Sequence, residues 1–342
     1  MRAVLFHGTG QLEVVDRPSR PLAADEVRLS VERAGICGSD IATWKGEWPS
    51  PHVPSVKGHE VCGSVLEVGS GVSGLNTGQF VAVRPIRGCG ACRHCQRGNY
   101  SRCNQFMMYG QQEPGGWAEE MIVRHDHARP LAPTVTPDDA LFAEPIAVVA
   151  HAFNLAGSLD GASVAILGAG VLGLIAIQVA YARGATRVFA TGRQDKKLEL
   201  AREFDAATAD ARTDDVVAVG LDNGGPYDVV LDCIGSSEAL NDAIRLSEAG
   251  GWIVLVAGPH EPELHFNYVE HRLREVAVIA SRIYGEDFDD CLELLAGGKL
   301  NLAPLLTHRY AIDDAVEAMA FAASNRADAI KVALQPADSL KP

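Results

Sequence analysis

Two hydrophobic patterns follow each other along the chain. Up to about Ala143, short apolar runs are separated by Gly and Pro, as in Glu26–Val31, Val61–Val68 and Gln79–Val83. Short runs of β-type residues with frequent turn residues between them are typical of irregular all-β structure. The first part of the chain is therefore expected to be a domain of short strands.

From about Ser163, apolar segments of strand length alternate with segments of helical periodicity. The pattern predicts strands at Ser163–Leu167, Arg187–Thr191, Asp228–Cys233, Trp252–Ala257 and Val276–Ala280, and helices at Val171–Arg183 and Lys196–Phe204. Parallel strands need crossover connections, and helices usually supply them. The sequence therefore predicts an α/β region with a doubly wound parallel sheet.

After about Ile283 the pattern becomes mainly helical. Helices are predicted at Asp287–Ala296 and Asp313–Ser324, followed by a short strand near Ala329–Leu334. The sequence has no internal repeat and no low-complexity segment. A third stretch of mixed character thus follows the two main regions.

Length, composition and charge narrow the class of protein. The 342 residues are enough for two domains, and 47% hydrophobic residues supply buried cores, which excludes a disordered chain. The net charge of -14, from 30 Lys plus Arg against 44 Asp plus Glu, argues against nucleic-acid binding and favours a small-molecule partner. No apolar run has the length of a membrane span, and residues 1–10 lack the features of a signal peptide. We therefore expect a soluble, cytoplasmic protein.

The eight cysteines form one cluster and four dispersed single residues. The cluster lies in a glycine-rich stretch at about 88–104, has the spacing C-x2-C-x2-C-x7-C, and consists of Cys89, Cys92, Cys95 and Cys103. Four thiolates suit tetrahedral zinc and leave no open coordination position, so the spacing predicts a structural zinc site. An iron–sulfur cluster is the competing interpretation, but its bacterial spacing ends in x3-Cys-Pro, unlike the x7 gap and Asn104. Four unmetallated thiols are the other alternative.

A glycine motif lies between the first strand and the first helix of the α/β region. The sequence GAGVLG at 168–173 fits the pattern G-x-G-x-x-G. In this pattern the first glycine permits a tight turn, the second lets the backbone approach a pyrophosphate, and the third allows close helix–strand packing. Free N–H groups at the helix N-terminus then bind the phosphates. The alternative is a glycine-rich turn that binds nothing. The motif predicts a Rossmann dinucleotide site that includes Gly168, Gly170, Val171, Leu172 and Gly173.

The end of the second predicted strand bears on the choice of cofactor. An NAD-binding domain usually has an acidic residue there for the ribose hydroxyls, but this chain reads Thr191-Gly192-Arg193. The missing carboxylate removes repulsion toward a 2′-phosphate, and Arg193 and Lys196 offer cations to pair with it. The pattern therefore favours NADP over NAD. In the alternative interpretation, Arg193 is a solvated loop residue and Asp195 reaches back to the ribose.

A second group of metal-ligand side chains is dispersed along the sequence. Cys37 lies in GICGSD at 35–40, His59 and Glu60 follow Gly58, and Glu144 precedes Pro145. A single Cys is usually a small core residue, and a single His usually serves as a hydrogen-bonding group. Spacing alone does not show that these residues converge.

Together, the motifs resemble the zinc-dependent medium-chain alcohol and polyol dehydrogenases. The matching pieces follow the family's order over essentially the whole chain: 35–40, 58–60, the four-cysteine stretch, 115–119 (GGWAE), 144–151 (EPIAVVAH) and 168–173. Within the family, EPIAVVAH and the tail at 302–334 are similar to the sorbitol dehydrogenase and L-idonate 5-dehydrogenase branch.

The resemblance also implies an architecture. We expect a GroES-like catalytic domain over residues 1–144 and a Rossmann NAD(P)-binding domain over 145–283, with 284–342 returning to the catalytic domain. The family fold implies a substrate cleft between the two domains. The family habit further implies a homodimer or homotetramer, with sheet edges of the nucleotide domain pairing across a two-fold axis.

The resemblance implies roles for the dispersed residues. Cys37, His59 and Glu144 would bind a catalytic zinc, and Glu60 would lie close to the metal or its water. Asp40 would hydrogen-bond the second ring nitrogen of His59 and so orient it. Such a mixed ligand set leaves a coordination position for a substrate oxygen, which a four-thiolate site does not.

One part of the family's pattern is missing. Ser39 would take the proton of the substrate hydroxyl, and many relatives pass it to a His five residues after the ligand cysteine. This chain has Ala42 at that place. Either the proton leaves through Ser39, the nicotinamide ribose and water, or another group such as His52 replaces the missing His.

The predicted reaction is NAD(P)-dependent oxidation of a secondary alcohol on a polyol, sugar or aldonic acid, or the reverse reduction. One alternative is a dehydrogenase of simple apolar alcohols, since Trp44, Trp48 and Phe106 are candidates to line an apolar pocket. The other is a non-catalytic, zinc-stabilised nucleotide-binding protein, which the presence of the complete second ligand set disfavours.

Overall fold

The chain folds into two compact units. The computed structural model describes residues 1–50, 52–258, 263–325 and 327–336. One unit comprises Met1–Glu144 with Leu302–Pro342, and the other comprises Pro145–Asn301. Within the described ranges, every helix is too short or too polar to cross a lipid bilayer.

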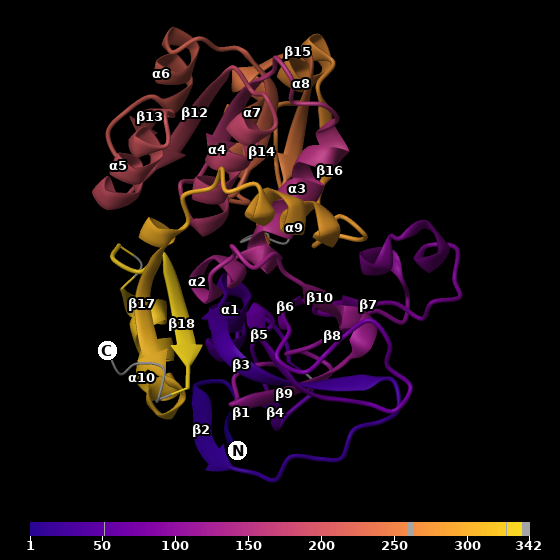
Figure 1. Cartoon of the computed structure of the whole chain (residues 1–342). Coiled ribbons are helices and arrows are strands. Elements are labelled where there is room, and N and C mark those ends of the chain that lie inside the picture. Colours follow the sequence, from indigo (N-terminus) through magenta and orange to yellow (C-terminus); the bar gives the residue numbers. More distant parts are fainter. Residues whose placement is uncertain (51, 259–262, 326, 337–342) are drawn as a thin grey trace. The chain divides into compact units, whose positions relative to one another are not determined.

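Short strands and turns make up most of the first unit (Figure 1). A seven-stranded sheet has the order β10-β6-β5-β3-β18-β17, with β9 also paired to β3, and a smaller sheet has the order β2-β1-β4. The strands are β1 (Arg2–Gly8), β2 (Gln11–Asp16), β3 (Glu26–Ile36), β4 (Ser55–Val56), β5 (Val61–Val68), β6 (Phe80–Val83), β7 (Ile86–Arg87), β8 (Met107–Met108), β9 (Glu120–Arg124), β10 (Ala128–Pro130), β17 (Leu306–Ala311) and β18 (Lys331–Gln335).

Alternation along β3 builds the core of this unit. Val27, Leu29 and Val31 are buried, whereas the residues between them are half-buried, because successive side chains of a strand point to opposite faces. β18 pairs antiparallel with β3, and Val332 lies opposite Ile36. The C-terminal stretch therefore completes the sheet that the N-terminal residues begin.

The helices of this unit are short. They are α1 (Gly38–Trp44), α2 (Pro137–Ala140), α10 (Ala315–Ser324) and the 3-10 helices η1 (Cys95–Arg97), η2 (Tyr100–Arg102), η3 (His125–His127), η4 (Ala303–Leu305) and η5 (Ile312–Asp314). α1 begins directly after β3, because Asp40 Oδ2 accepts a hydrogen bond of 3.0 Å from the backbone N–H of Cys37. This cap fixes the turn that carries Cys37, Ser39 and Asp40.

A six-stranded parallel sheet forms the centre of the second unit. Its strand order is β13-β12-β11-β14-β15-β16. The strands are β11 (Ser163–Leu167), β12 (Arg187–Gly192), β13 (Ala207–Asp210), β14 (Tyr227–Asp232), β15 (Ser247–Leu255) and β16 (Ala277–Ala280). Every residue of β11 is buried, as expected for a strand covered on both faces.

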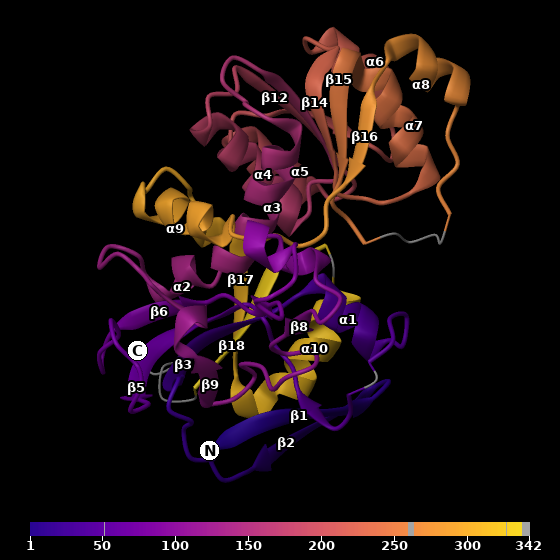
Figure 2. The ribbon, with the colours of Figure 1, turned by 90° about the vertical axis from the view of Figure 1, so that its right-hand side faces the viewer.

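Helices cover both faces of this sheet. The helices of the unit are α3 (Ala143–Ala156, which begins at the unit boundary), α4 (Val171–Ala182), α5 (Asp195–Glu203), α6 (Val216–Asp222), α7 (Ser237–Leu246), α8 (Tyr268–Arg274) and α9 (Phe288–Ala296). α4 and α5 lie on one face, and α6, α7 and α8 lie on the other (Figure 2). The strand order reverses between β11 and β14, and ligands of such sheets bind at the carboxyl ends of the strands beside that reversal.

Strong hydrophobic patterns located most of these elements correctly. β11 has the predicted bounds, and α4, β12, α5 and α9 agree with prediction to within one residue at each end. β13, α6, α7 and α8 were not predicted. β13 is a four-residue strand without a large apolar side chain, so it gives no recognisable strand pattern.

The chain returns to the first unit at Leu302, which corrects the predicted return at residue 284. Polar contacts explain why α9 stays with the second unit. His151 Nδ1 lies 2.9 Å from Asp287 Oδ2, and Arg183 Nη2 lies 3.1 Å from Asp290 Oδ2. These contacts tie the start of α9 to α3 and to the end of α4.

Candidate functional site

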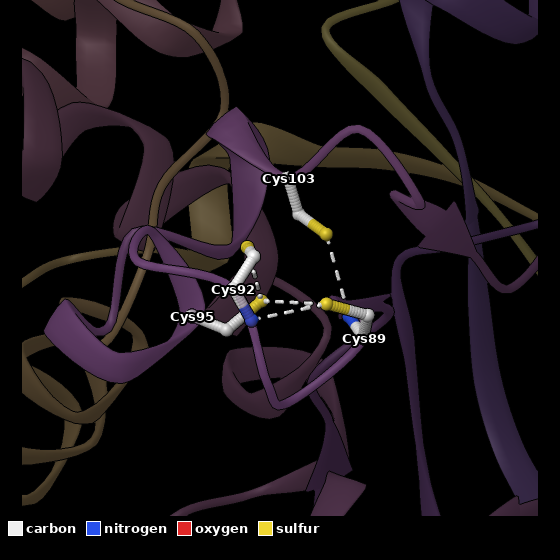
Figure 3. Close-up of side chains that lie close together, drawn as sticks. All are labelled: Cys89, Cys92, Cys95 and Cys103. Carbon is white, nitrogen blue, oxygen red and sulfur yellow. Dashed lines mark hydrogen bonds between the residues drawn. The ribbon is translucent and has the colours of Figure 1, made fainter.

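The four clustered cysteines converge in the first unit (Figure 3). Their sulfur atoms all lie within 4.8 Å of one another. Cys92 Sγ is 3.5 Å from Cys95 Sγ, and Cys89 Sγ is 4.0 Å from the same atom. A tetrahedral zinc with Zn–S bonds of about 2.3 Å places its sulfur ligands about 3.8 Å apart. The sulfur positions therefore fit a four-thiolate zinc site.

Backbone N–H groups and burial act on these thiols in opposite directions. Hydrogen bonds from the backbone N–H groups of Ala91 and Cys92 lower the pKa of Cys89 to about 6. Burial raises the pKa of Cys95 to about 12. A buried thiol of this kind becomes a thiolate at neutral pH only when a cation lies beside it, and a metal ion supplies that charge.

The structure also brings together Cys37, His59 and Glu60, whose ligand atoms lie within 4.8 Å of one another. Cys37 directly follows β3, and His59 and Glu60 directly precede β5. These two strands are antiparallel neighbours, with Ala34 opposite Val61, so the end of one meets the start of the other. Sheet pairing thus produces the convergence that spacing alone did not show.

Glycines of the sequence motifs make this packing possible. Gly58 has a φ of +92°, and a Cβ added there would clash with the Trp117 ring. Trp117 Nε1–H donates a hydrogen bond of 3.0 Å to Gly35 O, and a Cβ on Gly35 would clash with the Glu60 carboxylate. The segments GHE, GIC and GGW therefore pack against one another around the three candidate metal ligands, Cys37, His59 and Glu60.

Negative charge surrounds His59, which is 3% exposed. Burial lowers the pKa of His59, but the charges of Asp40, Cys37 and Glu144 outweigh burial and raise the pKa overall. Such surroundings stabilise positive charge at the ring, either as a protonated imidazolium or as a metal ion bound to a ring nitrogen. The donor set of thiol, imidazole and carboxylate is one that zinc accepts.

Asp40 faces the ring without the predicted hydrogen bond. Asp40 Oδ1 lies 3.7 Å from His59 Nδ1, beyond hydrogen-bond length. Within the described residues, both atoms are buried and neither makes a hydrogen bond. The carboxylate is thus the nearest partner for Nδ1, and this orientation leaves Nε2 available as the ligand atom.

Lys331 is a residue of this site that no sequence motif indicated. Its Nζ lies 2.6 Å from Glu60 Oε1 and 2.7 Å from Glu60 Oε2, and both side chains are only 1% exposed. Lys331 begins β18, whose pairing with β3 places it beside the donors. The ammonium group therefore neutralises one of the carboxylates near His59.

The remaining predicted residues lie in different surroundings. Glu144 is buried in the first turn of α3 and raises the pKa of His59, but it is outside the group of three converging donors in the described residues. Ser39 and Ala42 are half-buried on α1. His52 is exposed.

The glycine motif of the second unit forms the turn between β11 and α4. Gly168 has a φ of +101°, which favours glycine, and a Cβ on Gly173 would clash with Gly168 O, so backbone conformation and packing explain these two glycines. A Cβ on Gly170 would meet nothing within 4 Å, so packing does not require this glycine. Among the described residues, the N–H groups of Val171, Leu172 and Gly173 have no acceptor. Free donors beside an open glycine fit a bound pyrophosphate.

The predicted cofactor-selecting residues lie at the end of β12. Gly192 is its last residue, and Arg193 and Lys196 are exposed. The Asp195 carboxylate forms an ion pair with Arg212. The Asp195 carboxylate is therefore already paired with a side chain of this protein. The alternative in which NAD is preferred needs this carboxylate to bind the ribose.

Two domain families match the chain. The alcohol dehydrogenase GroES-like domain matches residues 23–133, and the zinc-binding dehydrogenase domain matches residues 171–297. These matches confirm the predicted fold class, a GroES-like β domain with a Rossmann sheet.

Full-length relatives agree with the domain matches. The sorbitol dehydrogenase of Halalkalibacterium halodurans is 33% identical and covers 97% of this chain and 98% of its own. The L-galactonate-5-dehydrogenase of Escherichia coli K12 is 33% identical over 85% of this chain and 86% of its own. The crystal structure of a zinc-binding dehydrogenase from Sinorhizobium meliloti bound to NADP is 34% identical, with a TM-score of 0.92 over 98% of this chain and 99% of its own. The chain therefore belongs to the zinc-dependent medium-chain alcohol and polyol dehydrogenases, which transfer hydride between an alcohol and a nicotinamide cofactor.

Proposed function

We propose that the protein oxidises a secondary alcohol group of a polyol, sugar or aldonic acid to the ketone, with NADP preferred over NAD, and catalyses the reverse reduction. The observation that carries this proposal is the convergence of Cys37, His59 and Glu60 in a chain that also has an open dinucleotide-binding turn. The names of the relatives, a sorbitol and an L-galactonate dehydrogenase, support a polyhydroxylated substrate.

For the catalytic centre we propose Cys37, His59 and Glu144 as protein ligands of zinc, with Glu60 close by. Zinc bound there would polarise the alcohol oxygen and lower its pKa, and the nicotinamide would accept the hydride. Lys331 holds both oxygens of Glu60, so Glu60 acts as a neutralised neighbour in this arrangement. That pairing supports Glu144 as the third protein ligand.

The chain's own groups orient the ring and move the proton. The Cys37 N–H holds one oxygen of Asp40, and the other oxygen faces the Nδ1 side of the His59 ring at 3.7 Å, where its negative charge favours a ring that keeps the Nδ1 proton. Ser39, on the same turn, accepts the substrate's hydroxyl proton. Ala42 carries no titratable group, so Ser39 would pass the proton to the ribose of a bound cofactor and to water.

We propose a second, structural zinc on Cys89, Cys92, Cys95 and Cys103, which makes two zinc ions per chain. The sulfur separations of 3.5 and 4.0 Å support it. Four thiolates fill the coordination sphere, so this zinc stabilises the fold and does not bind substrate.

The preference for NADP rests on the end of β12. Gly192 stands where NAD-binding domains usually have an acidic residue, and Arg193 offers a guanidinium beside it. The NADP bound to the Sinorhizobium meliloti relative supports the same choice.

A substrate screen tests this function. The purified zinc protein is assayed at 340 nm with polyols, aldonates and simple apolar alcohols, each with NADP and NAD at fixed ionic strength. We expect the highest kcat/KM with a polyol or aldonate and NADP. Turnover confined to apolar alcohols would contradict the substrate class, and a higher kcat/KM with NAD would contradict the cofactor choice.

We also propose that the protein is a homodimer or homotetramer built through β16. This strand ends the sheet order, and its Val278 is 38% exposed. An exposed apolar edge strand favours pairing with another strand, and a two-fold axis joins two such edges. Light scattering should show an oligomer that Val278→Lys dissociates, whereas a monomeric wild type would contradict the proposal.

A further inference from the structure

The end of β13 lies directly beside the cofactor-selecting turn of β12. Gly192 is paired in register with Asp210, the last residue of β13. The next backbone N–H, of Ala211, donates a hydrogen bond of 2.8 Å to Gly192 O. The residue that follows, Arg212, therefore projects from a backbone fixed to Gly192.

Arg212 joins this strand end to the start of α5. Its Nε donates to Asp210 Oδ1 at 2.9 Å, and its Nη2 donates to Asp210 Oδ2 at 2.6 Å. Nη2 also donates to the carboxylate of Asp195, the first residue of α5. The hydrogen bonds from Arg212 lower the pKa of Asp210 to about 2, so the Asp210 carboxylate stays ionised and paired with Arg212 at neutral pH.

Part of the Arg212 guanidinium makes no hydrogen bond among the described residues. An arginine has five N–H donors, of which two are on Nη1. Within the described residues, Nη1 of Arg212 donates no hydrogen bond, and the side chain is 45% exposed. Two N–H donors therefore remain for an anion that approaches Gly192.

Charge around the turn is balanced only because of Arg212. Asp214 adds a third carboxylate, since its Oδ2 accepts the N–H of Asp210 at 2.8 Å. Without Arg212 the remaining groups carry one net negative charge, which repels a phosphate. The turn has three carboxylates (Asp195, Asp210 and Asp214) and three cations (Arg193, Lys196 and Arg212).

We infer that Arg212 determines cofactor specificity: it neutralises Asp195 and Asp210 beside Gly192 and offers its free Nη1 donors to the 2′-phosphate of NADP. This inference rests on the proposed preference for NADP. It adds a residue 19 positions after Arg193 that the strand pairing brings to the same turn. It also gives a role to the Asp195–Arg212 ion pair, which engages the carboxylate that NAD binding would need for the ribose.

Binding of adenosine 2′,5′-bisphosphate and of 5′-AMP to the zinc-loaded protein tests the inference without turnover. Titration calorimetry at low, fixed ionic strength gives both dissociation constants. Arg212→Gln keeps most of the side-chain volume but removes the charge. We expect it to weaken bisphosphate binding about tenfold or more, and 5′-AMP binding less than about twofold, because charge-assisted hydrogen bonds to the phosphate are lost.

Control variants separate this role from a structural one. Arg245→Gln removes an exposed, carboxylate-paired arginine on α7 and should change neither constant. Arg212→Gln combined with Asp195→Asn should recover part of the bisphosphate affinity, because it removes a repelling carboxylate.

Two results would overturn the inference, and they are distinguishable. If the wild type binds both nucleotides equally, the proposed NADP preference fails together with the inference. If the wild type prefers the bisphosphate and Arg212→Gln keeps the same ratio, only the role of Arg212 fails.

Discussion

Lys331 balances a carboxylate inside the first unit. Its ion pair with Glu60 is almost completely buried, so neither charge is solvated by water. Removing one partner of a buried pair leaves the other charge uncompensated, which typically costs about 3–5 kcal/mol. Each partner is therefore needed to compensate the charge of the other, and the pair also reduces the negative charge at the proposed catalytic centre.

Lys331→Met is expected to lower the free energy of unfolding by about 3–5 kcal/mol. Adding Glu60→Gln removes the stranded charge and should restore most of that loss. Urea denaturation measures both, with Lys299→Met, an exposed lysine, as the control. If Lys331→Met unfolds with the same free energy as the wild type, the Glu60 charge is compensated by another partner.

Glu144 lies in the first turn of α3, where a carboxylate can bind a metal ion or interact with the helix dipole. Glu144→Gln should weaken the catalytic zinc by about 10–100-fold if the carboxylate binds metal or supports a ligand. Competition with a chromophoric chelator measures this affinity, and Glu199→Gln on the surface of α5 is the control. Unchanged zinc affinity with full activity would assign Glu144 to the helix alone.

His127 predicts a pH dependence of stability. It is 2% exposed, its Nδ1 lies 2.8 Å from Arg84 O, and burial lowers its pKa to about 4. In the unfolded chain its pKa is about 6.5. The unfolded state therefore binds the proton more tightly, and stability falls as the pH falls from about 6.5 to about 4.

This shift corresponds to about 3 kcal/mol lost across the window, at about 1.4 kcal/mol per pKa unit. His127→Gln should show a shallower fall in melting temperature than wild type between about pH 6.5 and pH 5. The neighbouring His125→Gln should keep the wild-type slope. Parallel slopes for wild type and His127→Gln would contradict the assignment.

At the scale of single residues, sequence motifs identified the candidate metal ligands but not the charged residues that pair with the site residues. Cys37 and His59 lie in recognisable sequence motifs, so they were predicted as candidate ligands. Lys331 is separated from Glu60 by 271 positions and lies in no motif, and Arg212 meets Asp195 only because β12 and β13 pair. Contacts of this kind depend on strand pairing, which local sequence does not specify.

At the scale of elements, the four-cysteine loop should depend on its metal. The loop contains only the short helices η1 and η2, so zinc has to contribute much of its folding free energy.

Cys103→Ser is expected to remove one zinc per chain and lower the melting temperature. Cys62→Ala is the matched control, because Cys62 is buried and lies outside the metal clusters. It should keep both zinc ions. Unchanged zinc content and melting temperature in Cys103→Ser would exclude the structural site.

Elements with long apolar runs were predictable, and elements specified by tertiary contacts were not. β11 and α4 follow directly from their patterns, since a fully buried strand and its crossover helix have few polar positions. β13 becomes a strand through pairing with β12, and its four residues contain no large apolar side chain.

At the scale of the whole molecule, the two hydrophobic patterns correctly indicated two different folds. Residues 284–301 were assigned to the catalytic domain but belong to the second unit. The helical pattern of this stretch does not reveal which domain the helix packs against. In the structure, His151 and Arg183 bind the acidic start of α9 and keep it in the second unit. The β18–β3 pairing then brings the tail back to the first unit.

The central claim is that a zinc held by Cys37 and His59 performs the chemistry, separately from the zinc of the cysteine loop and from nucleotide binding. His59→Ala tests it in one preparation by zinc analysis, calorimetric binding of adenosine 2′,5′-bisphosphate, and NADPH formation from the best alcohol substrate. We expect two zinc ions per wild-type chain and one per variant chain, with equal nucleotide affinity and NADPH formation only by the wild type. A variant that retains both zinc ions and wild-type turnover would contradict the account.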